Sequence, residues 1–199
     1  MSTLTQGYDR IGPMLVVRAM TDADVDAVAE VHVRTWQAAY AGIMPAAVLD
    51  ALDPAVSAAR RRERKLPDGA RTVVADEDGQ VVGFASFGPY RVQGTKDDYD
   101  YGYGEVYAIY VRPGHWGTGA GRALMAAARE GLAGYPEFRL WVLEDNHRAR
   151  RFYEKAGLVP DGEREFYTPP GAQEKLAEIR YSASILDSWR PDHPDLRPL

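Results

Sequence analysis

A glycine-rich stretch beyond the middle of the chain has the composition of a phosphate-binding loop. In Gly117–Gly121 every second residue is glycine, and the stretch lies between an apolar segment and an alanine-rich one. Glycine lets the backbone approach a ligand closely, and the first turn of a helix presents unpaired N–H donors with a partial positive charge. The pattern predicts a site for a phosphate or a pyrophosphate; a tight turn without a ligand is the alternative.

Two familiar phosphate-binding loops do not fit these residues. A Walker A loop ends in Lys followed by Ser or Thr, whereas Ala120 and Gly121 follow Gly119 here. A dinucleotide-binding loop has glycine at its first, third and sixth positions, and counting from Gly117 places Arg122 at the sixth. An enzyme that uses a nicotinamide dinucleotide, which would bind NADH, is therefore disfavoured.

Two motifs, in this order along the chain, resemble those of the GNAT superfamily of N-acetyltransferases. Segment 111–124 resembles the family's coenzyme A loop, Arg/Gln-x-x-Gly-x-Gly/Ala, with Trp116 in place of the first Arg or Gln and both glycines present. Segment 146–158 resembles the family's last helix, in which an Asn leads and a Tyr follows after seven residues. The resemblance covers residues 15–184.

The resemblance implies where acetyl-CoA binds. In this family two parallel strands splay apart, and the pantetheine arm lies in the gap, bonded to the first strand as an added strand would be. In this sequence the backbone of residues 109–111 would hold the pantetheine, the N–H groups of residues 117–122 the pyrophosphate, and Asn146 would contact the pantetheine. The implied coenzyme-binding residues are Ile109, Tyr110, Val111, Trp116, Gly117, Thr118, Gly119, Ala120, Gly121, Arg122, Asn146 and Tyr153.

Two side chains are the main candidates for proton transfer. By the resemblance Tyr153 lies beside the coenzyme sulfur, where a phenol with a pKa of about 10 stays protonated and can donate to a departing thiolate; alternatively it only packs in the core. Glu105 precedes Val111 by roughly 20 Å of extended strand, which is about the reach of an extended pantetheine arm from the pyrophosphate end. Glu105 is therefore the candidate base, acting through a water molecule. The alternative is a solvated carboxylate at the start of the strand. His32 and His115 are weaker candidates for the base.

The acceptor amine is expected among aromatic and acidic side chains. By the resemblance, the first helices and the segment before the coenzyme strand form the acceptor pocket, and these contain Trp36, Tyr40 and the tyrosine-rich, acidic segment 90–103, with Tyr107 on the strand itself. Such a mixture attracts a cationic amine through charge and cation–π contact. The alternatives are aromatic residues that form core and an acidic segment that is a solvated lid.

Hydrophobic periodicity and turn residues predict the elements that position these groups. The expected helices span 24–40, 45–51, 56–65, 122–132 and 146–156. The expected strands span 15–18, 71–75, 80–87, 105–111, 138–143, 165–167 and 176–184, with a long polar connection over 89–104. This order predicts an α+β fold with a mixed, largely antiparallel central sheet flanked by helices. A right-handed crossover makes the strand at 105 parallel to the strand at 138, and the resemblance implies that these two strands splay to form the coenzyme A cleft.

Composition limits the class of protein. The 199 residues, 45% hydrophobic and 27% charged, predict one domain over 15–186 between a flexible lead-in at 1–14 and a proline-rich tail at 187–199. The absence of cysteine excludes disulfides and thiolate nucleophiles, and no metal-ligand motif such as HExxH is present. The net charge of −5 argues against nucleic acid as a partner. Without a signal-peptide pattern or an apolar run of the ~20 residues that span a membrane, we expect a cytoplasmic protein with no membrane partner.

Together these features predict acetyl transfer from acetyl-CoA to a primary amine by direct attack in a ternary complex. A covalent intermediate is not expected, because the chain has no cysteine and no evident Ser-His-Asp set. A small cationic amine is the favoured acceptor, and a protein N-terminus or lysine is the alternative. A non-catalytic acyl-CoA-binding regulatory module is the rival from another class. Homodimers are common in the family, but no sequence feature requires one.

Overall fold

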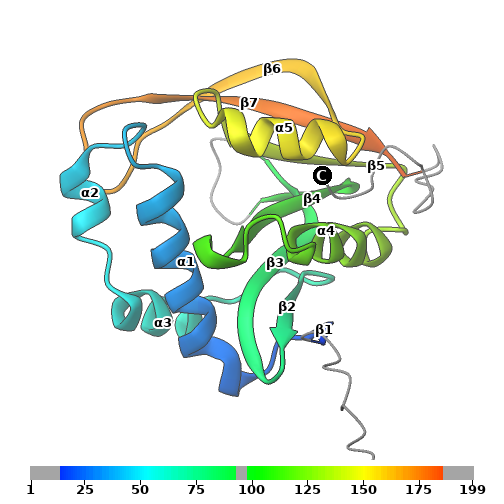
Figure 1. Cartoon of the computed structure of the whole chain (residues 1–199). Helices are drawn as coiled ribbons and strands as arrows, with labels where there is room; N and C mark the ends of the chain where they lie inside the picture. The colour runs from blue at the N-terminus through cyan, green and yellow to red at the C-terminus, as the bar shows by residue number, and fades with distance from the viewer. Residues whose placement is uncertain (1–13, 93–97, 186–199) are drawn as a thin grey trace, which may run out of the picture.

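The computed structural model describes residues 14–92 and 98–185, and these fold around one seven-stranded sheet (Figure 1). The strand order across the sheet is β1-β2-β3-β4-β5-β7-β6. The strands are β1 (Leu15–Ala19), β2 (Arg71–Glu77), β3 (Gln80–Arg91), β4 (Tyr99–Val111), β5 (Glu137–Leu143), β6 (Val159–Tyr167) and β7 (Leu176–Ser184). The helices are α1 (Val25–Ala39), α2 (Ala46–Asp50), α3 (Pro54–Glu63), α4 (Ala120–Gly131) and α5 (His147–Lys155), with 3-10 turns at Asp22–Asp24 and Pro113–His115.

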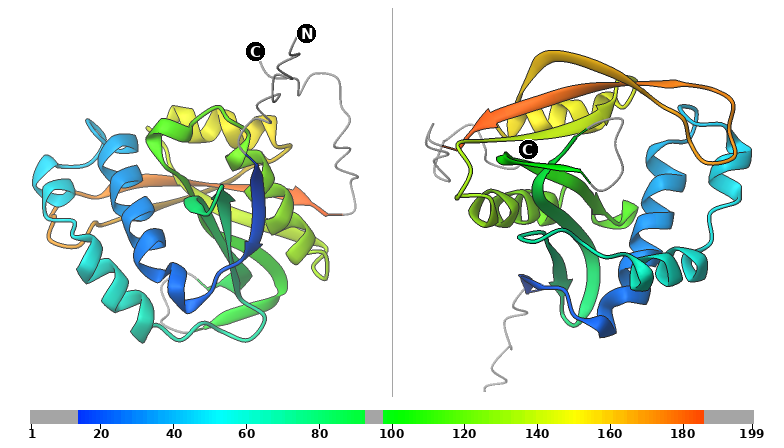
Figure 2. Two further views of the ribbon diagram at one scale, coloured as in Figure 1. Left: turned by 60° about the horizontal axis from the view of Figure 1, so that its bottom comes forward. Right: turned by 180° about the vertical axis from the view of Figure 1, so that it is seen from behind.

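Helices cover both faces of the sheet, because side chains alternate between faces along each strand. Val74 and Phe84 pack against α1 on one face, whereas their neighbours Ala75 and Ala85 pack in the cluster that includes α4. Helix α5 joins α4 on that second face, and α3 packs against α1 (Figure 2). Within the described residues no helix is both long and apolar enough to cross a bilayer.

Local chemistry fixes several of the element ends. The β2–β3 hairpin turns at Asp78 and Gly79, whose φ angles of 51° and 86° lie in the left-handed region that favours Gly, Asn and Asp. Helix α3 begins after Asp53, whose side chain accepts hydrogen bonds from the N–H groups of Ala55 and Val56. The elements therefore follow the sequence pattern closely, and the α+β class with a mixed sheet is confirmed.

Three strands extend well beyond their predicted bounds. Most of the expected polar connection over 89–104 is strand, since β3 runs to Arg91 and β4 begins at Tyr99, which pair with each other. Strand β6 begins at Val159 rather than 165, as an exposed edge strand that pairs only with β7. Polar strands at an edge lack the apolar alternation on which the prediction depends. The lead-in over 1–13, residues 93–97 and the tail from 186 lie outside the described residues.

The centre of the sheet opens between its two parallel strands. β4 and β5 pair only at Gly104 with Phe138 and at Glu105 with Arg139. Just beyond, the register of β4 against β3 shifts so that Tyr107 is an extra residue, which is a β-bulge. The remainder of β4 then diverges from β5, as the sequence resemblance implied.

Candidate active site

A cleft of about 880 Å³ lies where β4 and β5 diverge. Its walls come from both strands, the loop after β4, the three helices α1, α4 and α5, and the C-terminal hairpin. All three predicted acceptor residues, Trp36, Tyr40 and Tyr107, line it, and so does Tyr153. The structure therefore gathers most of the predicted site residues around one space.

The backbone of β4 offers a free edge to this cleft. The N–H of Arg112 donates to the carbonyl of Val82 in β3 at 2.8 Å. Since main-chain groups alternate between the two sides of an antiparallel strand, those of Ile109 and Val111 point toward β5, and those of Tyr110 toward β3. The Val111 carbonyl already accepts from Trp116 Nε1 at 2.6 Å and from the Thr35 hydroxyl at 3.1 Å. Of the three predicted backbone contacts, Ile109 is therefore the one best placed to bond a ligand.

The glycine-rich loop leads from this edge into α4. Gly117 and Gly119 have φ angles of 83° and 101°, which other residues rarely adopt. No N–H group of residues 117–121 donates to the backbone of another described residue. Trp116, at the position where the family pattern has Arg or Gln, ties the loop to the end of β4 and lies 3.2 Å from the guanidinium carbon of Arg148, measured to the ring centroid. The loop thus presents a row of donors at the N-terminus of a helix.

Cationic side chains surround the loop end of the cleft. Arg148, Arg151 and Lys155 recur at intervals of three and four residues, so they share one stripe of α5 that lines the cleft. Arg122 and Arg129 line it from α4. The sequence prediction included Arg122 alone among these cations, although the spacing on α5 was a signal that could have revealed the stripe.

Tyr153 and Asn146 lie at opposite ends of α5. Tyr153 is nearly buried, and its hydroxyl forms no hydrogen bond with any residue in the described part of the chain. Burial raises the pKa of this hydroxyl, so it stays protonated at neutral pH. Asn146 caps the helix by accepting from the N–H of Ala149 at 3.1 Å, and it also lines the cleft.

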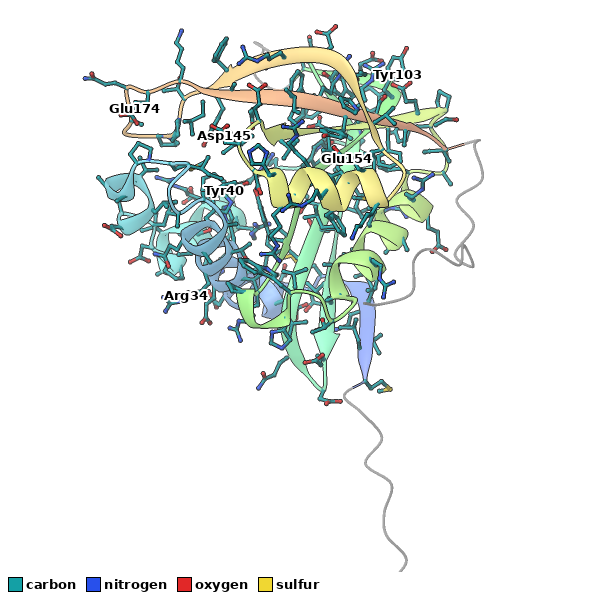
Figure 3. The ribbon with its side chains drawn as sticks, turned by 45° about the horizontal axis from the view of Figure 1, so that its top comes forward. Arg34, Tyr40, Tyr103, Asp145, Glu154 and Glu174 are labelled. Carbon is teal, nitrogen blue, oxygen red and sulfur yellow. The ribbon has the colours of Figure 1, made fainter. Side chains whose placement is uncertain are left out.

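Trp36 and Tyr40, two of the three predicted acceptor residues, form an aromatic wall of the cleft. Trp36 contacts the edge of Tyr40, with ring centroids 5.1 Å apart, and Tyr40 lies at the end of α1 that faces β7 (Figure 3). The Tyr107 hydroxyl donates to the carbonyl of Pro89 at 2.6 Å, so this residue contributes its ring rather than a free hydroxyl. Of the predicted segment 90–103, only Arg91 lines the cleft among its described residues.

Glu105 is not placed to act as a base. Its side chain is fully buried and does not line the cleft. Its carboxylate accepts from the backbone N–H of Arg91 at 2.8 Å and from Arg91 Nε at 3.0 Å, and it forms an ion pair with the same guanidinium. The distance along the strand predicts a base at Glu105. Its pairing with Arg91 was not expected, because the segment that contains Arg91 was predicted to be a loop.

His32 and His115, the weaker candidates for the base, also make contacts with other residues. His32 stacks on Tyr110 with ring centroids 5.3 Å apart, away from the cleft lining, and burial lowers its pKa to about 4. His115 lines the cleft at the loop end, and its Nε2 lies 3.1 Å from a carboxylate oxygen of Glu77. His32 also contacts the edge of Trp36, with ring centroids 5.0 Å apart, but it does not itself line the cleft.

One carboxylate in the cleft was missed. Glu178 of β7 lines the aromatic end, and burial together with the neighbouring charge of Glu165 raises its pKa to about 7. Sequence pattern alone could not find it, because its position depends on which strands flank β7. Among the described residues there is no cluster of His, Asp and Glu that could hold a metal ion.

Comparison with known sequences defines the family. The model of the acetyltransferase (GNAT) family matches residues 29–158, and the chain belongs to that family. YuaI of Bacillus subtilis (strain 168), an uncharacterized N-acetyltransferase, is 38% identical over 135 residues, which cover 67% of this chain and 74% of that protein. Rv2669 of Mycobacterium tuberculosis (strain ATCC 25618 / H37Rv), another uncharacterized N-acetyltransferase, is 36% identical over 151 residues, covering 74% and 89% of the two chains.

Solved structures share the fold. The yncA protein of Salmonella typhimurium with its cofactor acetyl-CoA superposes with a TM-score of 0.64 at 22% identity, covering 89% of this chain and 98% of that one. The paia N-acetyltransferase of Thermoplasma acidophilum in complex with coenzyme A gives a TM-score of 0.63 at 16% identity, covering 86% and 99%. With the family established by sequence, the chain is an acetyl-CoA-dependent acyltransferase of the GNAT class.

Proposed function

We propose that the protein transfers the acetyl group of acetyl-CoA to a primary amine by direct attack within a ternary complex. The observation that carries the proposal is the edge of β4 that β5 leaves unpaired. It borders the same cleft as the N–H-rich loop and Tyr153, whose hydroxyl has no hydrogen-bond partner among the described residues. Such a cleft would hold a long ligand between a phosphate site and a proton donor.

The donor end of the cleft fits coenzyme A by its chemistry. The N–H groups around Gly117–Gly121 and the cationic stripe of α5 would hold the phosphates. The carbonyl of Ile109 would accept from a pantetheine amide in the manner of an added strand, which leaves the Ile109 N–H for the thioester. These contacts come from the backbone and from charged side chains of α5. They do not depend on the side chain at position 116, where this chain has Trp in place of the family's Arg or Gln.

In this reaction the amine must lose protons to a base, and the leaving sulfur gains a proton from an acid. Acetyl-CoA supplies an acetyl carbon activated by a thioester. As the amine nitrogen bonds to that carbon and the C–S bond breaks, the Tyr153 hydroxyl gives its proton to the leaving sulfur. The Ile109 N–H stabilises the carbonyl oxygen. Holding the two reactants in line contributes the rest of the acceleration.

A thiol-release assay tests this proposal. Purified protein with acetyl-CoA and grouped primary amines, including polyamines, aminoglycosides, amino acids and peptides with free N-termini or lysines, should release free thiol with at least one group. Tight coenzyme A binding in calorimetry without thiol release from any group would instead favour a non-catalytic acyl-CoA-binding module. Release with peptides alone would make a protein amine the acceptor.

A further inference from the structure

Glu178 occupies a defined position at the acceptor end of the cleft. In β7 it pairs with Leu143 of β5 on one side and with Glu165 of β6 on the other. The next residue, Ile179, packs with the buried cluster under α4 and α5, so alternation directs Glu178 to the opposite face of the sheet. This is the face on which Leu143 packs against Met44, near the aromatic wall.

The carboxylate of Glu178 has no partner of its own. It forms no hydrogen bond and no ion pair with any residue in 14–92 or 98–185. Arg91, whose charge acts on Glu178, is held by Glu105. Arg180 is bound to Asp161 and to the Tyr90 hydroxyl. A partly buried carboxylate without a partner is costly unless a ligand supplies the missing charge.

The groups that face Glu178 explain its protonation behaviour. Burial and Glu165 raise its pKa, and Arg91 opposes them with a smaller effect. Glu105 adds a further negative charge, and Tyr40, Tyr110 and Tyr167 also feel the charge of Glu178. With a pKa of about 7, the carboxylate can both accept a proton and release it near neutral pH.

We propose that Glu178 binds the ammonium group of the acceptor between the aromatic side chains and then takes the proton that the amine must lose before it attacks. The acceptor is accordingly a primary amine that is cationic in solution, with an apolar or aromatic body that packs on Trp36 and Tyr40. The step balances, since one ammonium proton passes to the Glu178 carboxylate and the neutral nitrogen then bonds to the acetyl carbon. The second nitrogen proton, lost once the C–N bond has formed, returns to the Tyr153 oxygen that protonated the sulfur. This inference rests on the proposed function and names the base that it lacks.

The test compares E178Q with the matched control E165Q, its neighbour across the strand pair, which does not line the cleft. With the amine found in the thiol-release screen, E178Q should lower kcat by about 100-fold or more and remove the acid limb of the pH profile near pH 7. E165Q should keep kcat within threefold and move that limb to lower pH, because a like charge is removed. E178D should restore part of the activity.

A second readout does not depend on turnover. Proton-coupled ¹³C NMR of protein labelled at the glutamate carboxyls should contain one signal that titrates near pH 7, is absent in E178Q and shifts when n-butylammonium chloride is added. Butanol should leave it unchanged. An E178Q variant that keeps kcat and the acid limb, or a Glu178 signal insensitive to butylammonium, would overturn the role of Glu178. If the wild-type protein releases no thiol from acetyl-CoA with any amine, but butylammonium still shifts the Glu178 signal, the proposed function is wrong and the ammonium-binding site is retained.

Discussion

Replacing Arg91 with methionine should destabilise the fold strongly, because it leaves the Glu105 carboxylate buried without a cation. The Glu105 side chain has 0% exposure, whereas Arg91 is 38% exposed. Removing one partner of a buried ion pair costs about 3–5 kcal/mol, and at about 2–4 °C per kcal/mol for a chain of this size the melting temperature should fall by roughly 6–20 °C. Urea or thermal unfolding at pH 7 measures the loss.

Two further variants make this prediction specific. The double variant R91M/E105M should recover most of the loss, since a buried pair replaced by apolar side chains is often neutral. R62M removes one partner of the Arg62–Asp26 pair, whose side chains are 51% and 74% exposed, and should cost less than about 1 kcal/mol. A loss below 1 kcal/mol in R91M, or a double variant no more stable than R91M, would refute the reasoning.

The same residues decide whether Glu105 has any part in the chemistry. E105Q should retain kcat within about fivefold although it unfolds more easily, because the carboxylate serves Arg91 rather than the cleft. A folded E105Q protein with a kcat lowered by about 100-fold, the range of a lost general base, would return the role of base to Glu105.

Three more outcomes follow from individual contacts. Y153F should lower kcat by about 100-fold while coenzyme A affinity in calorimetry and the melting temperature stay unchanged, since the hydroxyl has no hydrogen-bond partner among the described residues. G119A should weaken coenzyme A binding about tenfold in the same calorimetry, through strain at its φ of 101° rather than a clash. The hydrogen bonds from Arg18 hold the pKa of the buried Asp24 well below its usual value, so their stabilisation is present above about pH 4 and is lost as pH falls toward the folded-state pKa. Acid unfolding curves of D24N should therefore lack part of this dependence.

The donor half of the site could be predicted because its signals are local. Gly117 and Gly119 sit where the backbone needs a positive φ, and Tyr153 follows Asn146 at a fixed interval on one helix. The divergence of the two parallel strands was implied only by the resemblance, but the structure confirms it. Short-range spacing was therefore sufficient for the loop, the helix and the strand that connects them.

The acceptor half could not be predicted because its contacts are not local. Arg91 meets Glu105 across a strand pair whose polar residues lack apolar alternation, so the segment was expected to be a loop. Glu178 reaches the cleft only because β7 inserts between β5 and β6, an order that no periodicity in the sequence encodes. The strand order, which the sequence does not reveal, determines which carboxylate lies beside the aromatic residues.

The two ends of the cleft carry side chains of opposite charge. At the loop end, cations on α4 and α5 line the wall beside free backbone donors, which suits phosphates. At the far end, Arg91 is neutralised by Glu105, so Glu178 is left as the carboxylate without a partner among the described residues. On the proposed function, an anionic coenzyme and a cationic amine entering this cleft would be sorted by charge before any specific contact forms. The Arg91–Glu105 pair bears on this arrangement, because Glu105 holds the Arg91 guanidinium, whose charge then opposes the raised pKa of Glu178 with only a smaller effect.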